Sequence, residues 1–223
     1  MFVFPTLILL GLWQLDRAEE KRGIEKSVNA ATDKSPLQLN SADKSNLRVE
    51  VYRKVSVKGK FDSERQYLWD NKIHQGRPGY QVLTAFVLEN SNTAVIVNRG
   101  WVPMLARRDQ MPDITVVPDI QTISGVIKDP SNTIQLAERI DQSGLTFPHV
   151  VQAFEPEFFE LELGISLLPV MVELDKSDDN GYVRDWRPFF GKIEKHNGYA
   201  LQWFLMAIIA FFLYFKLNLN RVE

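Results

Sequence analysis

Two runs of apolar residues, one at each end of the chain, dominate its pattern of hydrophobic and polar positions. The C-terminal run, residues 199–215 (YALQWFLMAIIAFFLYF), contains no charged side chain and ends at Lys216. As a helix it would measure about 26 Å, close to the hydrocarbon thickness of about 30 Å. A buried core helix is the alternative, but globular helices rarely stay apolar on every face for this length. The run therefore predicts a membrane span over residues 199–217.

The N-terminal run, residues 1–15 (MFVFPTLILLGLWQL), is broken only by Thr6 and Gln14. Its length is marginal for a span and leaves room for an N-terminal truncation. No basic segment precedes it and no small-residue cleavage site follows it, so a retained anchor is favoured over a cleaved signal peptide. Two spans would place both chain ends on one side of the membrane, and Lys216 and Arg221 mildly favour the cytoplasm for the C-terminus.

Between the two runs the period of the pattern changes several times. Residues 16–34 predict a continuing helix that ends at Ser35-Pro36. Residues 49–61 alternate between apolar and polar, as in a half-buried strand, and residues 80–88 form a near-continuous apolar strand. Further strands are expected at 93–98, 121–128, 147–153 and 169–174. Short helices are expected at 104–110 and at 155–163, the second followed by Gly164. We expect polar turns at 70–79 and 89–92, a loop at 112–118, and a hairpin turn at Asn180-Gly181.

Several short strands separated by turns predict an antiparallel sheet that curls or closes, decorated by short helices. The expected fold is therefore a membrane protein. Transmembrane helices at residues 1–15 and 199–217 flank an α+β extracytoplasmic domain, residues 16–198, which holds a curled antiparallel β-sheet or small barrel.

Composition and motifs exclude several classes of function. The net charge of −2, without a long basic run, argues against a nucleic-acid partner. The absence of cysteine excludes disulfides, thiolate zinc sites, thiol copper carriers and c-type haem attachment. No phosphate loop, dinucleotide fingerprint or nucleophile motif occurs, and the three histidines are far apart. Residues 175–186 resemble a calcium loop only superficially, because Trp186 occupies the twelfth position. We expect a protein that is not an enzyme.

Three residues with imidazole or aromatic side chains lie at the start of the second span. His196, Tyr199 and Trp203 lie at i, i+3 and i+7, so a helix projects all three from one face. Ala200 and Ala207 line the same side and would admit another helix or a flat ligand. The histidine could supply an axial ligand to a planar cofactor. From spacing alone an ordinary interfacial belt with a solvated histidine is the favoured interpretation.

The segment Asn98-Arg99-Gly100-Trp101-Val102-Pro103 combines hydrogen-bond donors, a permissive glycine, a large aromatic ring and a proline. One interpretation is a structural knot that locks a sheet edge to the core. The other is a rigid surface on which Arg99 and Trp101 meet a partner or a carboxylate-bearing ligand, with Asn98 and Gly100 shaping the turn.

This segment, together with Val97, resembles the hallmark of the Surfeit locus protein 1 family, whose members are cytochrome c oxidase assembly factors. Four further stretches resemble family motifs in the same order: residues 11–17 (GLWQLDR), 59–62 (GKFD), 79–84 (GYQVLT) and 196–204 (HNGYALQWF). Any one of them alone is weak, but together, between two spans, they are specific. Residues 129–169 depart from the family pattern.

The resemblance implies a multi-pass protein of the bacterial inner (plasma) membrane whose main domain faces the periplasm. It implies a role in assembling a haem-copper terminal oxidase, cytochrome c oxidase, by transiently holding or delivering haem a to the catalytic subunit. Haem-synthesis proteins and membrane lipid would be further partners. His196 matches the histidine that the family is thought to use toward haem.

Two hypotheses follow from the resemblance. In the first, His196 is the axial ligand of the haem iron, Tyr199 and Trp203 pack the ring, and Arg99 or Arg107 pairs with a propionate. In the second, the chain is a haem-free membrane scaffold that stabilises an oxidase subunit, with Trp101 and Trp203 as packing anchors. A membrane-tethered hydrolase is a third class, for which the sequence shows no nucleophile–base pair.

Overall fold

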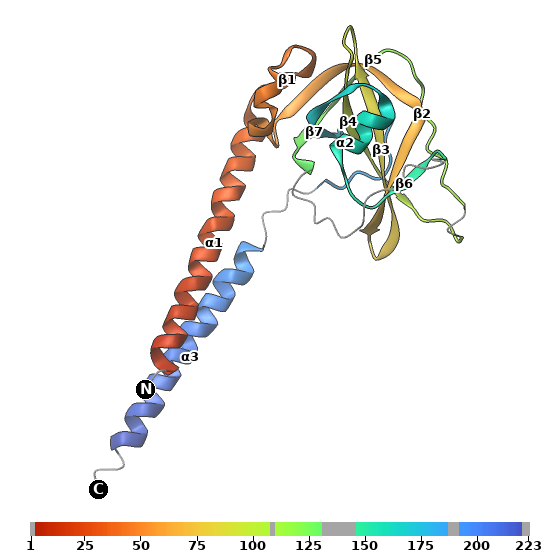
Figure 1. Ribbon diagram of the computed structural model, residues 1–223. Coiled ribbons are helices and arrows are strands. Elements are labelled where there is room, and N and C mark those ends of the chain that lie inside the picture. The colour runs from red at the N-terminus through yellow and green to blue at the C-terminus, as the bar shows by residue number, and fades with distance from the viewer. Residues whose placement is uncertain (1–2, 108–109, 131–145, 187–191, 220–223) are drawn as a thin grey trace. The chain divides into compact units, whose positions relative to one another are not determined.

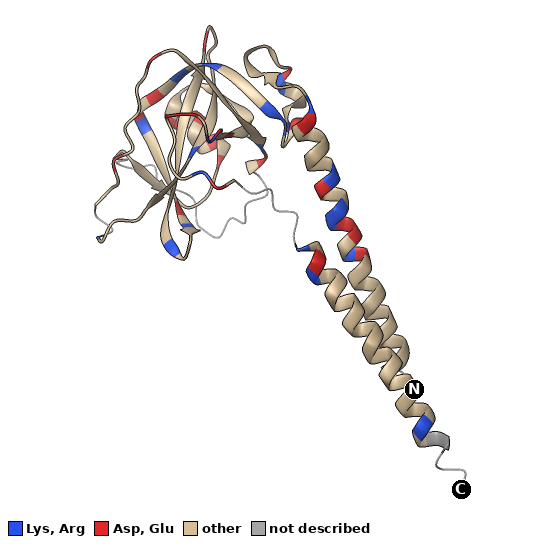
Figure 2. Cartoon of the chain, turned by 180° about the vertical axis from the view of Figure 1, so that it is seen from behind, with Lys and Arg blue, Asp and Glu red and all other residues tan. Residues whose placement is uncertain are grey.

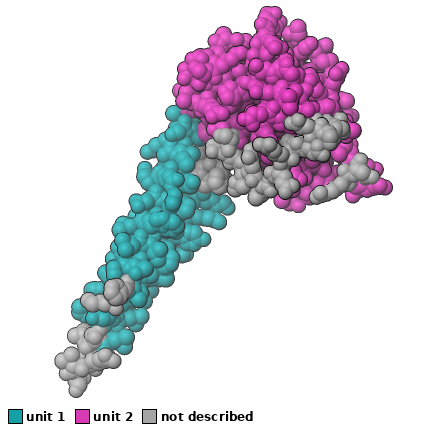
Figure 3. All heavy atoms as spheres, in the orientation of Figure 1, with its two compact units in different colours: residues 1–30, 187–223 teal, residues 31–186 magenta. Residues whose placement is uncertain are grey.

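A computed structural model describes residues 3–107, 110–130, 146–186 and 192–219 (Figure 1). The chain forms two compact units (Figure 3). Residues 1–30 and 187–223 make up the first, which we call the helix pair, and residues 31–186 make up the second, the sheet domain. The elements are α1 (Val3–Asp33), β1 (Leu37–Gln38), η1 (Leu39–Ser41), η2 (Lys44–Glu50), β2 (Lys54–His74), β3 (Arg77–Leu88), β4 (Thr93–Pro103), β5 (Gln121–Lys128), β6 (His149–Val151), α2 (Pro156–Leu163), β7 (Ser166–Leu174) and α3 (Ile193–Leu219).

In the helix pair α1 and α3 run antiparallel, side by side (Figures 1 and 2). The ring of Phe4 lies 5.7 Å from that of Phe211, and Gly11 packs directly against the ring of Phe204. Charged side chains of α1 begin at Asp16, and its preceding part is apolar, as is the facing part of α3 (Figure 2). The helix expected after residue 15 is present and continues α1 without a break to Asp33.

Among the described residues, one stretch, Ile193–Leu217, is long and apolar enough to cross a membrane. Only 11% of its most apolar window is buried, unlike a core helix, whose apolar faces are covered. The other expected span, residues 1–15, is the start of the much longer α1, and its Met1 and Phe2 lie outside the described residues. The sheet domain of 31–186 lies within the expected domain of residues 16–198, and the rest of that range belongs to the helix pair.

The sheet of the second unit closes on itself. Its strands pair in the order β2-β3-β4-β7-β5, and β5 pairs again with β2 to complete the ring. Not every pairing is antiparallel as expected: β4 and β7 run parallel, and β1 and β6 each add to β2 in parallel. Parallel strands cannot be joined by a tight turn, and β4 and β7 are accordingly separated along the chain by β5, β6 and α2.

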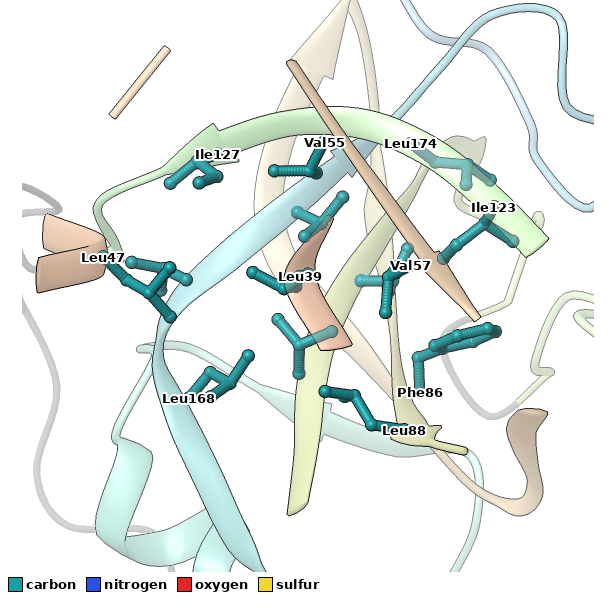
Figure 4. Close-up of a cluster of buried hydrophobic side chains, with 14 of the residues drawn as sticks. Leu39, Leu47, Val55, Val57, Phe86, Leu88, Ile123, Ile127, Leu168 and Leu174 are labelled. Atoms are coloured by element: carbon teal, nitrogen blue, oxygen red, sulfur yellow. The ribbon is translucent and has the colours of Figure 1, made fainter. Parts of the chain in front are cut away.

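The largest buried cluster, shown in part in Figure 4, unites side chains from most strands of the ring. Phe86 and Leu88 of β3 point into this cluster. Leu83 and Ala85, of opposite parity, point into a second cluster that α2 covers. The strand over 80–88 reads as continuously apolar because both of its faces are covered.

Residues at the two ends of α2 determine where this helix begins and ends. Pro156 starts it, and Gly164 ends it in the left-handed region at φ +66°, donating its N–H to Glu160 O at 2.9 Å. Phe158 and Phe159 then bury against the outer face of the barrel. This helix, the strand over 121–128 and the loop over 112–118 confirm the predictions from sequence.

Four local predictions are wrong. Residues 44–50 form the helix η2, begun by Asp43, which accepts from Ser45 N at 3.0 Å, so β2 starts at Lys54 and not at residue 49. β2 then runs on to His74, through half of the expected polar turn. The described residues of 104–110 hold no helix. No hairpin forms at Asn180-Gly181, because Val183 pairs with Trp101 instead of returning along β7.

Candidate functional site

A hydrogen bond between two polar side chains joins the two helices of the helix pair. His196, in the first turn of α3, donates from Nδ1 to Oε1 of Gln14 on α1 at 2.8 Å. Gln14 is 9% exposed, and His196 is half-buried. The bond therefore joins residues that lie 182 positions apart in sequence.

Small residues bring the two helices close enough for this bond. Gly11 and Ala18 lie one turn before and one turn after Gln14 on the same face of α1, and both are buried. A Cβ at Gly11 would lie 2.5 Å from a ring carbon of Phe204, so only glycine fits there without a shift. On α3, Ala200 is 1% exposed. Close approach through small residues is typical of helix pairs in membranes.

The hydrogen bond determines which ring nitrogen of His196 can act as a ligand. A glutamine Oε1 only accepts, so Nδ1 carries the proton and Nε2 of the neutral ring keeps its lone pair. Within the described part of the chain, Nε2 has no hydrogen-bond partner. A neutral imidazole with a free lone pair is one of the donors that haem iron takes from proteins. The residues present therefore fit an axial haem ligand.

The structure brings Tyr199 and Trp203 to the same helix as His196, at different depths. Tyr199 is 49% exposed, whereas Trp203 is half-buried. Ala200 and Ala207, expected to leave room for a ligand, are 1% and 3% exposed within the helix pair. A flat ligand at His196 would thus approach over the Tyr199 side of α3, because α1 already covers the alanines.

A cation also lies at this end of the helix pair. Arg22 donates from one terminal nitrogen to Asn197 Oδ1 at 3.3 Å and pairs through the other with Glu19 at 2.8 Å. Asn197 directly follows His196. Sequence reasoning missed both Gln14 and Arg22, although an amide inside an apolar run was a visible signal for the first.

A separate groove of about 960 Å³ lies between the opposite ends of the two helices, and most of its lining is apolar, including Val3, Phe4, Ala210 and Phe215. From His196 to Ala210 a helix rises about 21 Å. His196 is therefore not part of the lining of this groove.

Arg99, the expected propionate partner, is 2% exposed inside the sheet domain. Its guanidinium donates to Asn180 O at 2.7 Å, Gln66 Oε1 at 2.8 Å, Ile114 O at 3.0 Å and Thr115 O at 3.1 Å. Burial lowers the pKa of Arg99, yet a guanidinium remains charged at neutral pH. A group so enclosed is not presented to a propionate, so we assign Arg99 to holding the domain together.

The residues on either side of Arg99, Asn98 and Gly100, are buried in the same strand. Asn98 is 2% exposed and accepts from Gly100 N at 3.2 Å, and Gly100 has φ +117° beneath the backbone of Tyr182 and Val183. These two positions are therefore interior and do not form a partner surface. Trp101 is half-buried, and its Nε1 donates to Lys72 O at 3.0 Å.

Arg107, the other expected propionate partner, lies exposed in the segment after β4. It belongs to the sheet domain, as do Arg99 and Trp101, whereas His196, Tyr199 and Trp203 belong to the helix pair.

In the described part of the chain, no three His, Asp or Glu side chains lie close enough together to hold a metal ion. The loop that resembles a calcium site is organised by its own hydrogen bonds. Asp175 accepts from Ser177 N at 2.9 Å and from its hydroxyl at 2.7 Å, which forms a compact turn.

Comparison with known proteins gives consistent matches. A family model described as the SURF1 family matches residues 1–208. Surfeit locus protein 1 of Arabidopsis thaliana is 30% identical over 135 residues, which cover 55% of this chain and 38% of the plant protein. The SURF1-like protein of Rickettsia felis is 25% identical over 238 residues, covering 100% of this chain and 96% of that protein. Cytochrome oxidase assembly protein SHY1 of Saccharomyces cerevisiae is 25% identical over 104 residues, covering 46% and 27%.

The match to the plant protein, like that to the SURF1-like protein of Monosiga brevicollis, spans about two fifths of the relative's length, 38% and 40%. The family model, however, runs from the N-terminal helix through the Arg99 knot to the apolar part of α3. This chain belongs to the SURF1 family.

Proposed function

We propose that this chain is an assembly factor for a haem-copper terminal oxidase and that it holds haem a through Nε2 of His196. The observation that carries the proposal is the His196–Gln14 hydrogen bond at the start of an apolar helix, which leaves an imidazole lone pair available. The name of the yeast relative, cytochrome oxidase assembly protein, supports the assembly role. The haem is cargo, destined for the oxidase catalytic subunit, and haem-synthesis proteins are its source.

The membrane arrangement supports a site at the lipid surface. We place α3 across the bilayer, and the apolar start of α1 packs along it through Phe4–Phe211 and Gly11–Phe204. A segment packed along a spanning helix shares its depth, so we place a second span at the start of α1. Lys216 and Arg221 favour a cytoplasmic C-terminus, which puts His196 and the sheet domain on the periplasmic side of a bacterial inner membrane.

Single-cysteine labelling tests this topology cleanly because the natural chain has no cysteine. In intact cells, a membrane-impermeant maleimide should label Ser91→Cys, at an exposed turn of the sheet domain. It should leave Glu223→Cys unlabelled until the cells are permeabilised. Protection of Ser91→Cys in intact cells would contradict the arrangement.

The remaining residues have supporting roles in this proposal. Tyr199 and Trp203, which lie on α3 within two turns of His196, would supply aromatic surface for packing against the haem. Arg22 replaces Arg99 as the cation for a propionate, because its hydrogen bond to Asn197 holds it near His196.

The haem itself is tested by purification from cells that make haem a. We expect the wild-type protein to carry haem a absorbance and His196→Ala to lose it. His74→Ala is the matched control, because that histidine lies in the sheet domain beside Trp101. Equal haem content in all three proteins would refute the ligand role of His196.

A haem-free scaffold is the second candidate function, and the tip of the hairpin formed by β2 and β3 favours it. Ile73 is 75% exposed there, and the ring of the half-buried Trp101 lies 5.2 Å from that of His74 on the same hairpin. Exposed apolar and aromatic side chains on a rigid hairpin suit a protein partner. Haem-free protein that co-purifies with the oxidase catalytic subunit, and loses it on Trp101→Ala, would select the scaffold.

A further inference from the structure

We propose that Gln14 is a positioning residue that fixes the tautomer of His196 and so aims the lone pair at the ligand. This inference rests on the proposed haem-holding function and adds to it a residue from the other helix. His196 alone supplies an imidazole, which in isolation distributes its proton between two nitrogens. The hydrogen bond to Gln14 selects one of them.

The selection follows from what each atom can do. Oε1 of Gln14 has lone pairs and no hydrogen, and it lies 2.8 Å from Nδ1. In the orientation of the amide in which Oε1, and not its NH₂ group, faces the ring, a proton on Nδ1 makes this a hydrogen bond, whereas a proton on Nε2 of the histidine would set two lone pairs against each other. Ligating histidines generally donate their second ring nitrogen to such an acceptor, and losing it typically lowers metal affinity about 10–100-fold.

The packing around Gln14 keeps its amide in place. Gln14 is 9% exposed, with the buried Gly11 and Ala18 on either side of it along α1. An amide oxygen without a hydrogen bond is energetically costly in an apolar surrounding, so we expect the Gln14 side chain to keep its hydrogen bond to His196. The acceptor is therefore already oriented before any ligand arrives.

Nitrogen NMR of the full chain, labelled with ¹⁵N-histidine in lipid nanodiscs and without haem, measures the tautomer directly. At about pH 8.5, where free imidazole is neutral, we expect the wild-type His196 to carry its proton on Nδ1. Gln14→Leu should shift it toward Nε2, and Gln14→Glu, which keeps an acceptor, should preserve the wild-type pattern. Gln202→Leu removes an exposed amide from α3 and is the matched control.

Haem titration of the same four proteins measures the consequence. We expect Gln14→Leu to weaken haem binding about 10–100-fold, while Gln14→Glu and Gln202→Leu stay close to wild type. Wild-type haem affinity in Gln14→Glu would separate a role in positioning from a role in packing. Leucine and glutamate are similar in size, but only glutamate has an oxygen that accepts a hydrogen bond.

A glycine pair gives a second, independent test that leaves Gln14 intact. Gly11→Ala places a methyl group against Phe204 and should push α1 away, lengthening the Gln14–His196 bond and shifting the tautomer. Gly23→Ala is the control on the same helix, since nothing lies within 4 Å of its Cβ position. An unchanged tautomer in Gly11→Ala would overturn the claim that helix contact positions the bond.

The two proposals fail in distinguishable ways. A wild-type His196 protonated on Nε2, or equal haem affinity in Gln14→Leu and Gln202→Leu, overturns the role of Gln14 while haem binding stands. A wild-type protein that shows the Nδ1 proton but takes up no haem overturns the proposed function, and with it the positioning of His196 by Gln14 for haem.

Discussion

Replacing Arg99 with lysine keeps the buried positive charge but removes the planar guanidinium, whose N–H groups donate to several oxygens at once. The guanidinium reaches four oxygens within 3.1 Å, carried by Asn180, Gln66, Ile114 and Thr115. A lysine ammonium has three donors at one point on a shorter reach, so about two of these acceptors lose their partner. Each buried acceptor left unpaired costs about 1–3 kcal/mol. We therefore expect Arg99→Lys to lower the free energy of unfolding by about 2–6 kcal/mol.

Urea unfolding of the full chain in detergent measures this loss. Three tryptophans report on the sheet domain: Trp69, Trp101 and Trp186. Arg77→Lys is the control, because Arg77 is exposed at the start of β3, and surface changes of this kind stay within about 0.5 kcal/mol. An Arg99→Lys protein as stable as Arg77→Lys would refute the view that the arginine holds β2, the 112–118 loop and the Asn180 turn together.

Three further predictions concern the sheet domain. Tyr67→Phe should be neutral or stabilising in urea unfolding, because the buried Tyr67 hydroxyl has no hydrogen-bond partner among the described residues. Burial lowers the pKa of His149 below its ordinary 6.5, against the opposing charge of Glu162. The unfolded chain then binds more protons, so the free energy of unfolding should decrease as the pH is lowered below about 6.5, and His149→Phe should flatten this dependence. Gly125→Ala should lower the melting temperature, because its Cβ would overlap Glu173 O.

Local chemistry made part of the fold predictable. The alternation over 121–128 and the proline and glycine that bound α2 are complete within their own segments, so β5 and α2 could be placed from sequence. Residues 70–74 were predicted as a turn because they are polar. They continue β2 because a hairpin that extends beyond the core needs no apolar face.

Non-local pairing was not predictable in this way. β4 pairs in parallel with β7, and Val183 returns to Trp101 some eighty residues earlier, a contact that no local pattern encodes. The same holds for the candidate site. His196 was identified from its own helix, whereas its partner Gln14 lies at the other end of the chain. Arg99 was misjudged because charge suggests exposure, and only the assembled barrel supplies enough acceptors to bury it.

The spectrum of the oxidase in the cell tests the account most directly. Membranes from cells that lack this protein, complemented with the wild type, His74→Ala or His196→Ala, would be compared by their reduced-minus-oxidised absorbance. The account predicts that haem a absorbance of the oxidase is lost without the protein, restored by the wild type and His74→Ala, and not restored by His196→Ala. Normal haem a absorbance in cells without the protein would contradict an assembly role, and full restoration by His196→Ala would contradict the role of this histidine.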